Sequence, residues 1–501
     1  MKRFKNIILG TAALILLTVT SCEKYLDVNT NPNAPTSAPI QQVLTNVTVN
    51  VGFTGGSDMH RFTSLIVQQF AGQNAPGTQS REYARYLIQP TDVSGLYGRM
   101  FAIQLQDIEY ILKNSEGSPH YSGVSKILKA YIYSQAVDIW GDLPYSEAFQ
   151  APLINQPKID KAEDIYKAII TLTNEGINEL KATTSTLTPA VNETIFKGDR
   201  VKWEKFANTM KLRLFLRYSA KDAAFAKSQM DALIASNGPF MGAIADNFQM
   251  DFVDATASQN PLHQFENTRS DQFFPNKFFV DLLNSTADPR RPSYFTEFPF
   301  ASGTYKGATP LDGQSFAFSR MNTFLRGTLK TALVPDAQGR VPANPSNNTA
   351  YTGAAPIRML TFAEYNFIRA EHALRYGAGA LAAQPFFQAG IRASMTMANV
   401  SGTNQDTYIN SAKGLLNGLT LEANVSKIIT EKYIANYGVA LEPWNDWRRT
   451  GYPILTPVDA SIAAATAIPR SLFYPESEVA ANLNFKQRPT LLGRIFWDTR
   501  P

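Results

Sequence analysis

A single cysteine, Cys22, is the feature that most constrains how this chain can fold. It is the only cysteine in 501 residues, so no disulfide can form within the chain. Side-chain packing must therefore supply the stability of a large body. The position of Cys22 is also informative, because a basic start and an apolar run over 7–19 precede it.

The segment before Cys22 has the layout of a secretory signal, and it is too short to span a membrane. The small residues Thr20 and Ser21, directly before a lone cysteine, match the bacterial lipobox. There the thiol is acylated and the preceding peptide is removed, a reaction that suits a thiolate nucleophile. We predict a signal peptide over 1–21 and a lipid on Cys22; the alternative is a core cysteine that follows a signal peptide by chance.

Residues 22–40 are rich in Asn, Pro, Thr and Ser, which predicts a flexible leash, and we expect a single domain over 41–501. No later stretch offers the ~20 apolar residues of a spanning helix. Removal of the signal takes three basic residues away and lowers the net charge from +5 to +2. With no Lys/Arg-rich run, nucleic acid is not an expected partner.

Apolar residues recur at spacings of three and four over 127–135, 165–180 and 203–217, which predicts amphipathic helices. We assign the basic residues of the third helix to its outer face: Lys202, Lys205, Lys211 and Arg213. Short turns between helices favour antiparallel hairpins, although no 34-residue repeat is visible.

The chain changes character over 239–356, which holds 11 of the 29 prolines and shows helical periodicity only near 277–283. Long irregular segments inside a domain are usually binding surface, so we expect ligand contact there. Helices return after this region. Thr361 and Glu364 form a predicted capping box, and further helices are expected near 385–397 and 422–437.

Six segments carry a family resemblance in the right order: DIWGDLPYSEAF (138–149), GDRVKWEKFANTMKLRLFLR (198–217), DPR (288–290), FAEYNFIRAEHAL (362–374), EKYIANYGVALEPWNDWRRTGYP (431–453) and IPRSLFYPESEVAANLNF (468–485). With the lipobox and the Asn-Pro leash, they make the chain resemble the SusD/RagB family of outer-membrane lipoproteins. The WxDWRRTGYP form resembles a SusD-like branch distinct from the starch-binding members.

This resemblance implies a mainly α fold of tetratricopeptide-like helical hairpins, with a packed irregular loop-rich region. It also implies a lipid-anchored protein on the outer face of the outer membrane. Such proteins bind oligosaccharides, or peptides in RagB, and deliver them to a SusC-like TonB-dependent β-barrel transporter without any cofactor. The alternatives are the same role with peptide or other non-glycan cargo, a lipid-anchored glycan hydrolase, and a purely structural lid.

Catalytic and metal sites are not expected. Glu442 and Asp446 beside two indoles, Trp444 and Trp447, could suggest a glycosidase pair. We favour a structural cluster, in which the arginines at 448 and 449 pair with those acids. Asp138, Trp140 and Asp142 are likewise interpreted as structural residues of the helix end and turn around Gly141. The histidines lack metal-binding spacing and are His60, His120, His263 and His372.

Exposed aromatic rings with polar neighbours are the side chains that would bind a sugar, because its C–H face is apolar and its hydroxyls need polar partners. Tyr83, Tyr86 and Tyr97 lie in a polar, loop-like stretch, and three further candidates lie in the proline-rich region. The predicted ligand-binding residues are therefore Tyr83, Tyr86, Tyr97, Tyr305, Phe318 and Arg320. The alternative for each is ordinary packing.

Overall fold

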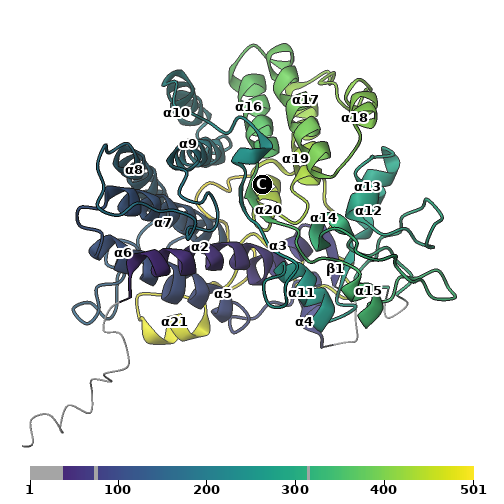
Figure 1. Cartoon of the computed structure of the whole chain (residues 1–501), viewed down its shortest axis with the longest axis horizontal. Helices are drawn as coiled ribbons and strands as arrows, with labels where there is room; N and C mark the ends of the chain where they lie inside the picture. Colours follow the sequence, from purple (N-terminus) through teal and green to yellow (C-terminus); the bar gives the residue numbers. More distant parts are fainter. Residues whose placement is uncertain (1–37, 73–76, 313–315, 501) are drawn as a thin grey trace, which may run out of the picture.

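A computed structural model describes residues 38–72, 77–312 and 316–500. The predictions for the signal peptide, for Cys22 and for the leash as far as residue 37 lie outside these residues. Figure 1 shows helices packed side by side, with a loop-rich part beside them and strands confined to short pairs. No helix among the described residues is long and apolar enough to cross a membrane.

The first half of the chain is helical, as the apolar spacing predicts. Its elements are α2 Ile40–Gly56, α3 Asp58–Ile66, α4 Gln79–Ala84, α5 Ser94–Gly98, the π-helix η1 Arg99–Leu105, α6 Gln106–Lys113, α7 Pro119–Trp140, α8 Ala162–Leu180, α9 Arg200–Arg217 and α10 Ala223–Ala235. α7 opens on a proline in its first turn and ends at Gly141, whose φ of +79° suits glycine. Asp199 caps α9 by accepting the Val201 and Lys202 amides.

α7 and α8 form an antiparallel hairpin. Gly123 near the start of α7 faces Gly176 near the end of α8, and a Cβ on either would lie 2.8 Å from the other's carbonyl oxygen. At the opposite end, the Tyr166 hydroxyl donates to Asp138. The glycine pair therefore allows the two backbones to approach closely.

The region over 239–356 is irregular, as predicted, and its described elements are all short. They are η2 Ile244–Asp246 (a 3-10 turn), β2 Phe248–Met250, α11 Pro261–Thr268, β3 Phe273–Pro275, α12 Lys277–Ser285, α13 Arg291–Tyr294, α14 Thr323–Arg326 and α15 Pro345–Thr349. β3 pairs antiparallel with β1 Phe70–Gly72, and β2 pairs antiparallel with β4 Ile357–Leu360. These two ladders tie the loops to the helical body.

The last part of the chain returns to helices: α16 Phe362–Tyr376, α17 Ala380–Met397, α18 Gly402–Ile409, α19 Leu421–Ala435, α20 Glu442–Thr450 and α21 Glu476–Ala481. α16 packs along α17, and α19 packs against both (Figure 1). Thr361 caps α16 by accepting the Glu364 amide at 3.1 Å, which confirms half of the predicted capping box. The other half is wrong, because the Glu364 carboxylate turns to Arg213 instead.

Two hydrophobic clusters hold these helices together. The larger lies under α2, α3 and α7–α9, and a smaller one joins α16, α17 and α19 through residues such as Phe367, Phe387 and Ile429. The outer face predicted for α9 is corrected by the structure: Lys211 and Arg213 are each only 7% exposed. Burial is possible because Lys211 donates to Asn174 and Arg213 pairs with Glu364.

Candidate ligand-binding recesses

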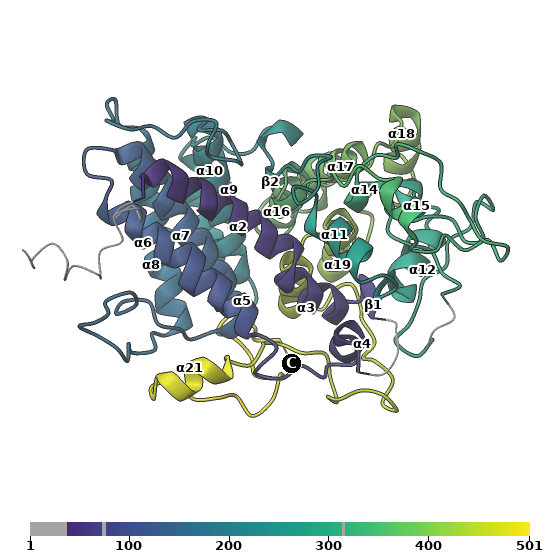
Figure 2. The same cartoon turned by 60° about the horizontal axis from the view of Figure 1, so that its bottom comes forward.

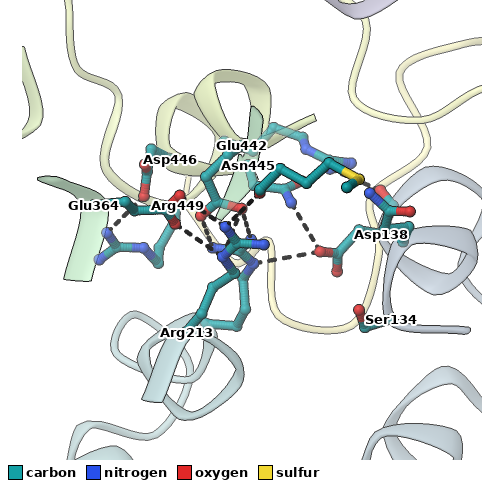
Figure 3. Close-up of polar contacts among 12 residues, drawn as sticks. Ser134, Asp138, Arg213, Glu364, Glu442, Asn445, Asp446 and Arg449 are labelled. Carbon is teal, nitrogen blue, oxygen red and sulfur yellow. Dashed lines mark hydrogen bonds and ion pairs between the residues drawn. The ribbon is translucent and has the colours of Figure 1, made fainter. Parts of the chain in front are cut away.

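α20 is the centre of a buried network of charges. Helical spacing places Glu442 and Asp446 on one face, where they meet cations from two other helices (Figure 3). Arg217 of α9 donates two hydrogen bonds to Glu442, at 2.9 and 2.6 Å. Lys432 of α19 lies 3.2 Å from Glu442 and 2.8 Å from Asp446. The acids therefore anchor α20 to α9 and α19.

The two consecutive arginines of α20 have different partners. Arg449 forms a bidentate ion pair with Glu371 at 2.6 and 2.7 Å and also contacts Asp446 at 3.0 Å. Arg448 instead donates to the Asp138 carbonyl at 2.7 Å, and its guanidinium lies 3.9 Å from the centroid of Trp444. The predicted pairing with the neighbouring acids is thus confirmed for Arg449 and wrong for Arg448.

Asp138 also belongs to this network, so its interpretation as a residue of the turn around Gly141 is corrected. It accepts a hydrogen bond from Asn445 at 2.8 Å (Figure 3). It also accepts one from the Trp497 indole at 2.9 Å, and Arg217 lies 3.4 Å away. Asp142 does have the structural role expected of a turn residue, since its carboxylate accepts a hydrogen bond from the amide of Ala162 at the start of α8. The sequence did not reveal that Asp138 points into the core.

The network leaves no carboxylate pair free for glycoside chemistry. Burial raises the pKa of Glu442, but Arg217, Arg213 and Lys432 outweigh it and hold that pKa well below its usual range. Glu442 and Asp446 are at most 3% exposed. Two acids that are buried and paired with cations lack the substrate access that a glycosidase pair needs.

The structure corrects the exposure expected of the six predicted ligand-binding residues, because all are buried at 2 to 9% exposure: Tyr83, Tyr86, Tyr97, Tyr305, Phe318 and Arg320. Tyr97 stacks on Phe101 with ring centroids 4.2 Å apart. Tyr83 packs on Phe62 of α3 at 4.6 Å. The ligand-binding role of these six residues stays a prediction.

The other four predicted ligand-binding residues are buried beneath neighbouring side chains and loops. The Tyr86 hydroxyl accepts the Val458 amide at 3.2 Å and so holds a loop of the C-terminal segment. Tyr305 packs beneath the guanidinium of Arg291. Phe318 and Arg320 share contacts with one ring, Phe274, and Arg320 also pairs with two acids, Glu266 and Asp271. The surface rings that could meet a ligand are elsewhere.

One recess, with a volume of about 720 Å³, lies where α20 ends. We call it the α20 recess; its walls include Arg375, Glu422, Trp447, Arg449, Tyr452, Arg470 and Arg500. Most of its guanidiniums are engaged: Arg449 and Arg375 with Glu371, and Arg470 with Asp498. The recess therefore holds less unpaired charge than its arginines suggest.

A second recess, of about 310 Å³, combines apolar and polar walls from α3, α12 and the loops at 309–311 and 456–462. We call it the α12 recess; its lining includes Leu65, Gln68, Lys277, Phe278, Asp281, Leu311 and Val458. The ring of Phe278 is half-buried, and Leu311 is exposed. An accessible ring beside a charged pair and an amide suits a ligand with an apolar face and polar edges.

A third recess, of about 260 Å³, lies between α3 and α11. We call it the α11 recess; its lining includes Ser57, His60, Arg61, Gln264, Phe265, Thr268, Arg269 and Phe273. The half-buried ring of Phe265 is approached by the guanidiniums of Arg61 and Arg269, whose central carbons lie 5.7 and 5.6 Å from its centroid. The site is thus an aromatic platform beside two cations.

The α11 and α12 recesses are neighbours. Arg61 and Leu65, one turn apart on α3, line one recess each, and Phe273 and Asn276 do the same at β3. Figure 2 shows α3, α4, β1, α11 and α12 in the same part of the molecule. Both recesses take walls from the region over 239–356, where ligand contact is expected. In the sequence, the four-residue spacing of Phe265 and Arg269 was the pattern from which the α11 recess could have been predicted.

Within the described ranges, no group of three or more His, Cys, Asp or Glu side chains is arranged to hold a metal ion. The four histidines lie on different helices, α3, α7, α11 and α16. The chemistry that these recesses offer is noncovalent recognition by rings, guanidiniums, amides and hydroxyls.

Together, these features define a helical-hairpin protein whose surface carries recesses walled partly by loops. A family model described as SusD-like, starch-binding associating with outer membrane, matches residues 32–475. The chain therefore belongs to the SusD-like family. No curated protein matched the sequence.

Solved structures agree on the fold. A chitin-binding protein is 24% identical, with a TM-score of 0.76, over 92% of this chain and 100% of its own. A chitin-binding SusD homolog from Flavobacterium johnsoniae is 22% identical, with a TM-score of 0.73, over 92% and 99%. A SusD homolog from Bacteroides uniformis is 21% identical, with a TM-score of 0.74, over 92% and 99%. The predicted mainly α, tetratricopeptide-like architecture is confirmed.

Proposed function

We propose that the chain is a surface-exposed lipoprotein, anchored through Cys22, that binds oligosaccharide nutrients and delivers them to a SusC-like TonB-dependent transporter. The family match over residues 32–475 carries the proposal, because its description joins starch binding to the outer membrane. Two of the similar structures are named as chitin-binding, which supports a glycan as the cargo.

The α11 and α12 recesses are the proposed glycan site. Each places a half-buried phenylalanine ring, Phe265 or Phe278, beside amide and charged side chains. The apolar face of a pyranose can lie on such a ring while its hydroxyls meet the polar groups. Two neighbouring recesses suit an extended oligosaccharide better than a single sugar.

Binding without catalysis fits the buried network. The acids that could resemble a glycosidase pair, Glu442 and Asp446, are committed to Arg217, Lys432 and Arg449. A lipid-anchored hydrolase would need a different, accessible pair. The alternative is that the same recesses bind peptides instead of oligosaccharides.

The test is calorimetry on the mature, full-length chain with chitin oligomers, maltoheptaose and a set of short peptides. Saturable binding of at least one oligosaccharide, recovered uncleaved after prolonged incubation, supports the proposal. Binding of peptides alone would replace the glycan with peptide cargo, and cleavage of the oligosaccharide would overturn the assignment as a binding protein.

A further inference from the structure

The α11 recess carries more positive than negative charge. Asp58 of α3 is the carboxylate that pairs with Arg61 and also lies 3.7 Å from Arg99. Within the described residues, the guanidinium of Arg269 has no carboxylate partner, and its only assigned contact is with the ring of Phe265. Of the two described guanidiniums that line this recess, those of Arg61 and Arg269, only that of Arg61 has a carboxylate partner.

The nearby like charges affect the pKa of Arg61. Burial lowers the pKa of Arg61, Tyr83 raises it, and the nearby charges of Arg269 and Arg99 lower it further. An anion placed between these guanidiniums would relieve that repulsion. Its charge would be held by the strongest class of hydrogen bond, between guanidinium and carboxylate.

One residue that lines the same recess, His60, carries a buried nitrogen without a hydrogen-bond partner among the described residues. His60 is 1% exposed, its Nδ1 lies 3.5 Å from the Ser64 hydroxyl, and its Nε2 has no hydrogen-bond partner in the described structure. Burial lowers the pKa of His60 to about 3, so the imidazole is neutral at physiological pH. Buried polar atoms without partners are rare, and a ligand hydroxyl at this wall would satisfy it.

We propose that the α11 recess is a subsite for an acidic saccharide, whose carboxylate meets Arg61 and Arg269, whose ring lies on Phe265 and whose hydroxyl meets His60. This inference rests on the proposed glycan-binding function and narrows its ligand class. The volume of about 260 Å³ lies below the range of about 300–1,000 Å³ for sites of drug-sized ligands, which suits one charged sugar unit of a longer chain.

The test compares methyl β-D-glucuronide with methyl β-D-glucoside by calorimetry on the mature full-length chain, at 50 and 300 mM NaCl. We expect the glucuronide to bind at least tenfold more tightly at low salt and to lose most of that preference at high salt. Equal affinities at low salt would overturn the acidic-saccharide proposal. If maltoheptaose or chitin oligomers still bind, the general glycan function survives that result.

Substitutions test whether the saccharide carboxylate binds in the α11 recess. Arg269→Gln removes an exposed charge and should abolish most of the preference for the glucuronide. Arg392→Gln is the matched control, because Arg392 of α17 is also exposed and pairs with the exposed Asp406 of α18. His60→Phe should weaken both saccharides, with thermal unfolding to verify that it folds. A glucuronide preference unchanged by Arg269→Gln would overturn the proposal. Binding of the tripeptide Gly-Gly-Phe more tightly than methyl β-D-glucuronide would also overturn it.

Discussion

Arg217 and Glu442 are 225 residues apart in the sequence and form a bidentate ion pair at 2.9 and 2.6 Å inside the protein. Their side chains are 1% and 4% exposed. The pair joins α9, from the N-terminal helices, to α20, which packs against α19 and α3. The pair therefore ties the two halves of the chain together.

Breaking the pair should be strongly destabilising. Arg217→Gln leaves Glu442 buried with one strong partner fewer, and removal of one member of a buried ion pair costs about 3–5 kcal/mol. Urea unfolding of the purified protein measures this loss. Arg392→Gln breaks an exposed pair and should cost about 0–1 kcal/mol. Similar losses for the two variants would contradict a stabilising role for the buried network.

Acid should weaken the network through Glu371. Burial raises the pKa of Glu371, but Arg449 and Arg375 outweigh it, so the folded-state pKa lies below the unfolded value of about 4.3. The folded state then binds fewer protons, and this stabilisation is complete above the unfolded pKa and is lost as the pH falls.

The measurement for this prediction is the difference in unfolding free energy between wild type and Glu371→Gln. It should be constant above about pH 5 and should narrow as the pH falls below about 4. A difference that stays the same or widens on acidification would show that Glu371 titrates without a lowered pKa.

Buried and half-buried rings should respond differently to truncation. Tyr97→Ala removes a ring stacked on Phe101 in the core, and we expect a loss of about 3–5 kcal/mol in stability with unchanged affinity of the folded protein for oligosaccharide. Phe278→Ala in the α12 recess should weaken oligosaccharide binding at a smaller cost in stability. Reduced affinity in folded Tyr97→Ala, with normal affinity in Phe278→Ala, would contradict this expectation and support the predicted ligand-binding role of Tyr97.

The lipid anchor depends on one side chain. Cys22→Ser in the native host should abolish incorporation of labelled palmitate and leave a precursor that retains the 21-residue signal. Ser21→Ala keeps a small residue before the cysteine and should be processed normally. Label on the Cys22→Ser protein would refute attachment at this residue.

Local pattern was sufficient to predict the long helices. The 3.6-residue periodicity around Ile127, Ile165 and Trp203 marks α7, α8 and α9, and the Thr361 cap marks the start of α16. These features depend on residues within a few turns of one another. The proline-rich composition likewise predicts the irregular region, because proline and glycine disfavour long helices wherever they cluster.

The charge network and the recesses could not be predicted in the same way. Arg213 has a polar side chain at a position that the pattern assigns to solvent, and only a partner 151 residues away, Glu364, makes its burial favourable. Likewise, Phe265 becomes a platform because Arg61, far away in the sequence, lies over it. Tyr83 and Tyr86 lie in a polar stretch whose composition is typical of a binding surface, but tertiary packing buries their rings.

The most direct test of the central claim is a gentle detergent pull-down of the full-length protein from its native outer membrane, read by native mass spectrometry. We predict that a large β-barrel transporter is recovered with the lipoprotein, and that added oligosaccharide appears as extra mass on the complex. Recovery of the lipoprotein alone, at high yield and with other barrels intact, would contradict its role as the binding partner of a transporter.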